Sequence, residues 1–233
     1  MIAVILAGGK GTRLRPYTVT MPKPLVPIGD KAILEILLGR LKKHGVTEAH
    51  ICLGHFAEMI KAFIGKGDRF GMDIRYSVED KPLSTIAPLK LLPELPENFL
   101  VMNGDLLTDL DFSHFFRNHL ERRSLLTVAT YRRRTRMDYG VIEVDPSSRT
   151  AIGFREKPEY DVEVSMGVYA MNRSVLDLVP QGKAFGFDDL MHALLREGKE
   201  IPVYPYDGYW LDIGRPDDFE KANTDFSTGM PWV

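Results

Sequence analysis

The chain has 233 residues, 44% of them hydrophobic, and a formal net charge of -2 at pH 7. That length can bury one sizeable core, and a charge near zero excludes the overall basic field that attracts nucleic acids. With one cysteine, Cys52, the chain can form neither an internal disulfide nor a cysteine-based metal site. No apolar run reaches the length of a membrane-spanning helix, and the N-terminus carries no cationic leader. We therefore expect a cytoplasmic protein that binds no membrane.

A predicted strand and a glycine-rich loop open the chain. Residues Ile2–Leu6 are apolar and rich in β-branched side chains, which is typical of a buried strand. The loop that follows has three glycines within four positions, so backbone N–H groups can converge on an anion without obstruction by Cβ atoms. Positive charge lies close by, at Lys10, Arg13, Arg15 and Lys23. The combination predicts a polyphosphate site.

The spacing of this loop differs from two familiar phosphate-binding loops. Val4 stands where a P-loop requires its first glycine, and Leu14 stands where a dinucleotide-binding loop requires its third. The loop is therefore of another type. Lys10 and Arg15 are equally well explained as solvated surface charges.

Strands and helices alternate through the first half of the chain. We expect strands at Ala49–Leu53, Asp73–Val78 and Asn98–Met102, and helices at Lys31–Lys43, Ala57–Ile64 and Pro88–Leu92. This alternation implies right-handed crossovers and a mostly parallel sheet, that is, an α/β fold. Ligands of such sheets collect at the carboxyl ends of the strands, where both the opening loop and Asp105 fall.

After Ser113 the pattern changes. A helix to about Arg122 is followed by strands joined through short turns, as expected of antiparallel pairs. The predicted strands are 125–131, 139–145, 151–154, 164–171, 201–206 and 209–213, and helices are predicted at 174–178, at 188–197 and from 216 onward. We interpret residues 113–233 as a small antiparallel lobe built onto residues 1–112 within a single domain.

Two motifs near the N-terminus carry a family resemblance. The pattern G-G-x-G-T-R-L-x-P-x-T begins at Gly8, and P-K-P-L-x-P-I begins at Pro22. Together they resemble the signature of sugar-1-phosphate nucleotidyltransferases, and the second motif, with S-M-G-V-Y from Ser165, resembles the mannose- and heptose-1-phosphate guanylyltransferase branch. The resemblance implies a Rossmann-like three-layer sandwich, the nucleotide-diphospho-sugar transferase fold, with a nucleotide-binding half (1–112) and a sugar-phosphate-binding half (113–233).

The implied reaction joins an NTP to a sugar-1-phosphate and releases pyrophosphate. In that scheme Arg13 holds the β- and γ-phosphates and Lys23 contacts the α-phosphate. Asp105, from an N-G-D motif, and Asp212, from W-x-D-I-G, are the expected ligands of a Mg²⁺ cofactor, which suits two carboxylates plus phosphate oxygens. The full nucleotide-binding set that we expect is Leu6, Ala7, Gly8, Gly9, Gly11, Thr12, Arg13, Lys23, Glu79, Ser84, Thr85, Asn103 and Gly104.

The sugar-phosphate side is expected to involve residues of the second half. Glu156 and Lys157 match an E-K-P motif in which Glu binds sugar hydroxyls and Lys binds the sugar phosphate. Glycines inside two predicted strands indicate close approach of a ligand. The full sugar-phosphate-binding set that we expect is Tyr139, Gly140, Glu156, Lys157, Ser165, Gly167 and Trp210.

One segment departs from the family pattern. Relatives commonly read L-G-T-A-G-P-L, whereas this chain has Ser84, Ile86 and Ala87 in place of Gly, Ala and Gly. The loss of both glycines and the bulk of Ile86 are expected to narrow the space for base or ribose and to affect base selection. Glu79, just upstream, is a candidate acceptor for the N–H groups of guanine or cytosine.

The resemblance to the guanylyltransferase branch implies GTP with mannose-1-phosphate or a manno-heptose-1-phosphate as the substrate pair. A UTP-, dTTP- or CTP-dependent enzyme remains an alternative, and a non-catalytic nucleotide-sugar-binding regulatory subunit is the competing class. Retention of Arg13, Lys23, Asp105 and Asp212 favours the enzyme. We expect no nucleic-acid partner and no C-terminal left-handed β-helix, and a homodimer is left open.

Overall fold

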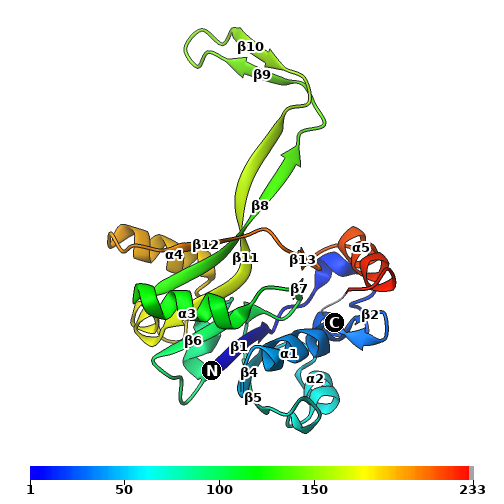
Figure 1. Ribbon diagram of the computed structural model, residues 1–233. Helices are drawn as coiled ribbons and strands as arrows, with labels where there is room; N and C mark the ends of the chain where they lie inside the picture. The colour runs from blue at the N-terminus through cyan, green and yellow to red at the C-terminus, as the bar shows by residue number, and fades with distance from the viewer. Residues whose placement is uncertain (231–233) are drawn as a thin grey trace.

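A seven-stranded mixed sheet lies at the centre of the computed structural model, which describes residues 1–230 (Figure 1). Its strands, in the order β12-β8-β11-β6-β1-β4-β5, are β1 (Ile2–Ala7), β4 (Glu48–Leu53), β5 (Asp73–Val78), β6 (Asn98–Asn103), β8 (Leu126–Arg136), β11 (Glu159–Asn172) and β12 (Val203–Tyr206). Within this described sheet only β11 runs antiparallel to its neighbours. The predicted mostly parallel sheet is confirmed.

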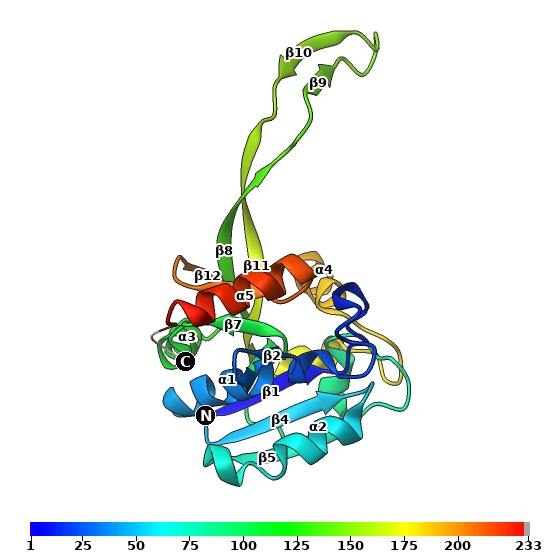
Figure 2. The same cartoon turned by 90° about the vertical axis from the view of Figure 1, so that its right-hand side faces the viewer.

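Helices cover both faces of the sheet. One face carries α1 (Ile33–Lys43), α2 (Ala57–Ile64) and α3 (Phe112–Arg122), and the other carries α4 (Phe187–Arg196) with the 3₁₀ helices η4 (Ala87–Leu91) and η5 (Arg173–Leu178). Because strand side chains alternate between faces, Ala3 and Ile5 pack with the first group and Val4 with the second. The expected three-layer sandwich is confirmed (Figure 2). No helix within residues 1–230 has both the length and the apolar content to cross a bilayer.

Two small sheets and a last helix lie beside the main sheet. β7 (Leu106–Thr108) pairs with β13 (Trp210–Asp212), and β2 (Pro27–Ile28) pairs with β3 (Lys31–Ala32). This last pairing makes α1 begin at Ile33, two residues later than predicted, with the Glu35 carboxylate accepting the Ala32 N–H at 2.9 Å. Helix α5 (Pro216–Ser227) covers a separate apolar cluster that includes Leu14 and Ile213.

A long ribbon projects from the body. Strands β8 and β11 extend well past the predicted 125–131 and 164–171, and β9 (Val141–Val144) with β10 (Ala151–Arg155) forms the tip (Figures 1 and 2). We call residues 132–163 the arm. Cross-strand charges support its outer part: Arg132 lies 2.8 Å from the Asp161 carboxylate, and Arg134 lies 3.6 Å from that of Glu159. Antiparallel pairing is as predicted, but the inner parts of β8 and β11 belong to the central sheet, and only their outer parts and the β9–β10 pair stand away from the body.

Buried His119 on α3 generates a prediction about stability. Its ring contacts Thr127 Oγ1 at 2.8 Å and Asn98 Oδ1 at 3.2 Å, and burial lowers the pKa of His119 to about 4. An unfolded histidine binds its proton near pH 6.5, so below that pH the unfolded state gains protons that the folded state does not. Because of this difference at His119, we expect the free energy of unfolding to fall by roughly 2 kcal/mol when the pH is lowered from 7 to 5.

Urea unfolding of the wild type and of His119→Asn at both pH values measures the effect. The variant should lose less stability than the wild type over this interval, whatever its stability at pH 7. Equal losses in the two proteins would contradict the assignment.

Candidate functional site

A cavity of about 710 Å³ opens at the carboxyl ends of β1, β4 and β6. This is where ligands bind in parallel sheets, and the volume is in the range of small-molecule sites. Every residue predicted to bind the nucleotide lines it: Leu6, Ala7, Gly8, Gly9, Gly11, Thr12, Arg13, Lys23, Glu79, Ser84, Thr85, Asn103 and Gly104. Lys10 and Asp105 line it as well. The first half of the chain therefore builds one continuous wall.

Two glycines of the glycine-rich loop lie close to other residues of this wall. Gly11 has φ of +61°, and a Cβ there would lie 3.1 Å from both Lys23 and Thr18. A Cβ on Gly8 would lie 3.0 Å from the Glu79 carboxylate. Gly9 differs, because no described atom comes within 4 Å of a Cβ placed on it. The backbone at Gly9 is thus left open, and it lies in the cavity wall.

Two carboxylates and one ammonium group meet at the edge of the cavity. Asp105 precedes β7 and Asp212 ends β13, and the pairing of these strands sets Asp212 opposite Leu106. The Ile213 N–H also donates to the Asp105 carbonyl at 3.0 Å. Lys23, only 8% exposed, donates to Asp105 Oδ2, and its Nζ lies 3.9 Å from Asp212 Oδ1. We call these three residues the charge cluster.

The charge cluster has an excess of negative charge. Burial raises the pKa of Asp212, the nearby Asp105 carboxylate raises it further, and Lys23 and Arg13 act in the opposite direction. Arg13 also lies near the cluster, since its guanidinium would be 3.8 Å from a Cβ on Gly214. Residues 1–230 contain no group of three or more His, Cys, Asp or Glu side chains placed to hold a metal. Two carboxylates are nevertheless what Mg²⁺ takes from a protein when substrate phosphates supply further oxygens.

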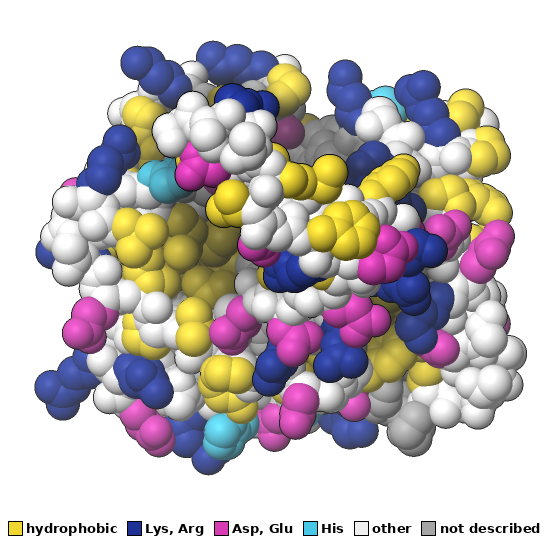
Figure 3. All heavy atoms as spheres, turned by 90° about the horizontal axis from the view of Figure 1, so that it is seen from above, with side chains coloured by type: hydrophobic (Ala, Val, Ile, Leu, Met, Phe, Trp, Pro, Cys, Tyr) yellow, Lys and Arg dark blue, Asp and Glu magenta, His cyan; other side chains and the backbone are white. Residues whose placement is uncertain are grey.

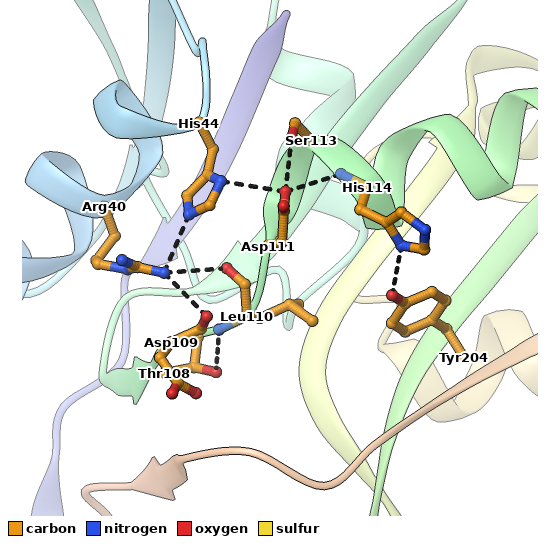
Figure 4. A network of polar contacts seen from close by, with 9 residues as sticks. All are labelled: Arg40, His44, Thr108, Asp109, Leu110, Asp111, Ser113, His114 and Tyr204. Carbon is orange, nitrogen blue, oxygen red and sulfur yellow. Dashed lines mark hydrogen bonds and ion pairs between the residues drawn. The ribbon is translucent and has the colours of Figure 1, made fainter. Parts of the chain in front are cut away.

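A polar network fixes the segment behind the charge cluster (Figure 4). Arg40 on α1 donates to the carbonyl of Asp109 at 2.9 Å, and the His44 ring lies 3.1 Å from the Asp111 carboxylate. Asp111 caps α3 by accepting the His114 N–H, and Thr108 Oγ1 donates to the carbonyl of Tyr209 at 2.8 Å. The residues just after β7 are thereby tied to α1, to α3 and to the start of β13. This bracing holds the two strands that present Asp105 and Asp212.

The structure divides the predicted sugar-phosphate set into two groups. Ser165, Gly167 and Trp210 lie in the body: the Trp210 indole N–H donates to the Met166 carbonyl at 2.9 Å, and a Cβ on Gly167 would lie 2.6 Å from the Asn103 amide nitrogen. Asn103 lines the cavity, so Gly167 lies next to a lining residue, although none of the three is itself among the described residues that line it.

The second group lies on the arm. Tyr139, Gly140, Glu156 and Lys157 are all exposed, and a Cβ on Gly140 would approach Phe154 and the Glu156 carboxylate. None of the four is among the described residues that line the cavity. The sequence motifs grouped all seven residues in one set, whereas the fold places three of them in the body and four on the arm.

In the segment that departs from the family pattern, the fold accommodates Ser84 and Ile86 in different ways. Ser84 has φ of +70°, a conformation that glycine adopts easily and that other residues adopt at a cost. Ile86 is fully buried in the cluster that packs against α4, and the described cavity lining does not include it. Ile86 therefore does not narrow the cavity as expected, because its side chain points into the core.

Sequence reasoning missed several residues of the cavity wall. His55, to which the sequence analysis assigned no role, lines the cavity together with Gly54 and Lys81. Position could have identified His55, since it lies two residues beyond the carboxyl end of β4. Gly54 is also restricted, because a Cβ there would lie 2.8 Å from both the Glu79 carboxylate and the Gly8 carbonyl.

Comparison with known proteins identifies the family. A family model described as Nucleotidyl transferase matches residues 2–229. The chain belongs to this family. The resemblance that the N-terminal motifs indicated is thereby confirmed.

Several nucleotidyl transferase relatives are similar over almost the whole chain. A UTP–glucose-1-phosphate uridylyltransferase of Synechocystis sp. is 34% identical over 95% of this chain and 62% of its own length. A mannose-1-phosphate guanyltransferase of Debaryomyces hansenii is 32% identical over 99% of this chain and 66% of its own length. This chain therefore spans just under two thirds of these curated relatives.

Solved structures of the family share the fold. HddC from Yersinia pseudotuberculosis superimposes with a TM-score of 0.76 at 27% identity, over 97% of this chain and 99% of that one. A second structure of HddC, complexed with GMP-PN, gives a TM-score of 0.74 at 26% identity, over 97% and 99% of the two chains. The expected fold class is confirmed.

The strained Ser84 generates a prediction. Replacing it with glycine removes the steric cost of a positive φ from the folded state. Glycine also gives the unfolded chain more conformational entropy, but this opposing contribution is the smaller of the two. Ser84→Gly should raise the unfolding free energy by about 0.5 kcal/mol in urea titrations. The control is Ala62→Gly at an exposed interior position of α2, which should lower it by roughly 1 kcal/mol. A Ser84→Gly variant as destabilised as the control would contradict the argument.

Proposed function

We propose that the protein is a Mg²⁺-dependent sugar-1-phosphate nucleotidyltransferase, which forms an NDP-sugar and pyrophosphate. The charge cluster carries the proposal, because Lys23, Asp105 and Asp212 meet at the edge of a cavity whose other wall is an open glycine-rich loop. The family and the names of the relatives support it. A regulatory subunit that only binds nucleotide-sugars would have no need of this cluster.

The proposed reaction needs positioned charge rather than a general base. The attacking oxygen belongs to a phosphate monoester whose second pKa is about 6, so it is already ionised at neutral pH. The barrier comes from repulsion between two polyanions and from the charge that develops on the departing pyrophosphate. Arg13, on the exposed side of the loop, would hold the β- and γ-phosphates through paired hydrogen bonds.

Lys23 would contact the α-phosphate. It lies between Pro22 and Pro24, whose fixed φ angles restrict the backbone, and its side chain is buried against Asp105. A cation held in place before the reaction loses little entropy when the transition state forms. Asp105 and Asp212 would hold the Mg²⁺ ion. Bound there, the ion would neutralise phosphate charge and act as a Lewis acid.

Guanine is the proposed base. The Glu79 carboxylate accepts the Leu83 N–H through Oε2 at 2.8 Å, while Oε1 faces Gly8 and Gly54 in the cavity wall. A carboxylate in this position suits the adjacent N1–H and N2–H donors of guanine, and HddC has been crystallised with GMP-PN. The similar Synechocystis uridylyltransferase makes UTP the second candidate.

A screen of pyrophosphate release tests the activity and the choice of substrates together. We expect release with GTP and a manno-configured sugar-1-phosphate, in the presence of Mg²⁺, to exceed release with UTP, dTTP or CTP. Preference for UTP would overturn the proposed base. No release with any pair, together with measurable NDP-sugar binding, would overturn the proposed activity in favour of a regulatory subunit.

Asp212→Asn tests the role of the charge cluster. The amide keeps the shape of the side chain and removes its charge, so kcat should fall by at least about 100-fold while the urea midpoint changes little. Asp217→Asn, an exposed carboxylate in the first turn of α5, is the matched control and should retain wild-type kcat. Near-normal turnover by Asp212→Asn would disprove the assignment.

A further inference from the structure

The tip of the arm presents an apolar face to solvent. In the β9–β10 pair Ile142 lies directly opposite Phe154, and their side chains are 58% and 64% exposed. Val144 follows two residues after Ile142 and so points to the same side. The other side carries an ion pair, with Arg155 and Glu143 3.2 Å apart. A two-stranded ribbon with an uncovered apolar face is marginally stable, which indicates that this face packs against another surface.

The arm is extended, so the apolar face of its tip cannot pack on the cavity of the same chain. Its ladder runs without a register shift from Thr130 opposite Ser165 to Arg136 opposite Glu159. At about 3.3 Å per residue, these six steps carry the chain roughly 20 Å from the body. Lys157 lies beyond the outer end of the ladder. Two views at right angles show the arm leading away from the body (Figures 1 and 2).

The charge of the arm favours a protein partner. Between residues 132 and 163 the basic and acidic side chains are equal in number: Arg132, Arg133, Arg134, Arg136, Arg149, Arg155 and Lys157, against Asp138, Glu143, Asp145, Glu156, Glu159, Asp161 and Glu163. A nucleic acid requires net positive charge on its partner, and this segment has none. Seen from above, acidic and basic side chains are intermixed over this whole face of the molecule, and hydrophobic side chains gather in a hollow to one side of it (Figure 3).

A matching apolar surface lies on the rim of the cavity. Tyr17, Val19 and Met21 are exposed on the loop between Arg13 and Lys23, and both of these cations line the cavity. Tyr17 packs against Phe219 of α5 with ring centroids 4.7 Å apart, which fixes one end of this surface. If the Ile142–Phe154 face of one copy packed on this rim of a second copy, the E-K-P segment of the first copy would lie at the cavity of the second.

We infer that two copies of this chain exchange arms, each packing its tip on the rim of the other and supplying Glu156 and Lys157 to the other copy's sugar-phosphate site. The exchange rests on the proposed function for the roles of these two residues. It completes a cavity whose described lining contains none of the predicted arm residues. The two contacts are equivalent, as a closed twofold dimer requires.

Complementation between two defective variants tests the shared site. Arg13→Ala and Lys157→Ala alter exposed residues on different sides of that site, and each alone should lose most pyrophosphate release. Differently tagged chains are co-expressed and the mixture is assayed. With random pairing, half of the dimers are mixed and each mixed dimer holds one intact site, so activity should return to about a quarter of wild type. No recovery, with an active wild type, would overturn arm exchange.

Sedimentation tests the arm contact independently of catalysis. The wild type should sediment as a dimer, and Ile142→Asp and Phe154→Asp should shift it to a monomer. Leu195→Asp is the matched control, because Leu195 is an equally exposed apolar residue on α4, and it should leave the dimer intact. A monomeric wild type, or tip variants that remain dimeric, would overturn the inference. If the wild type is inactive but its dimer still depends on the tip residues, the proposed function is wrong and the arm contact stands.

Discussion

The attraction of Lys23 for Asp105 and Asp212 is the interaction on which the site depends. The three side chains come from a proline-flanked 3₁₀ turn, from the turn between β6 and β7 and from a strand in the second half of the chain. A buried ammonium without a carboxylate partner would cost several kcal/mol, so folding of these segments around one another is coupled. The charge cluster is therefore structural and chemical at once. It holds the two halves together where the cavity opens.

The fold explains why this location suits phosphate chemistry. Parallel strands end on one side of the sheet, so the glycine-rich loop, Glu79 and Asp105 converge although they are far apart in sequence. The network around Arg40 and Asp111 braces the end of the β7–β13 pair that lies away from Asp105 and Asp212. Rigid support of this kind allows charged groups to keep their positions before the substrates bind.

Much of the site was predictable because its signals are local. Glycine spacing, prolines around Lys23 and acids at strand ends each reflect a backbone requirement that a single segment reveals. The arm was not predictable in the same way. The β8 part of the arm lacks apolar alternation, and the run Arg132–Arg134 resembles a solvated loop until Asp161 and Glu159 are placed across the ladder. The orientation of Ile86 likewise depends on the packing of α4, which the local pattern does not contain.

The most direct test of the account is metal binding at the charge cluster, observed with Mn²⁺ in place of Mg²⁺ by electron paramagnetic resonance. In the presence of GTP, the wild type should bind one Mn²⁺ ion more tightly than GTP alone does, and Asp105→Asn and Asp212→Asn should each lose that additional affinity. Asp217→Asn should behave as the wild type. Equal Mn²⁺ binding by the wild type and both charge-cluster variants would contradict the claim that Asp105 and Asp212 form the reaction centre.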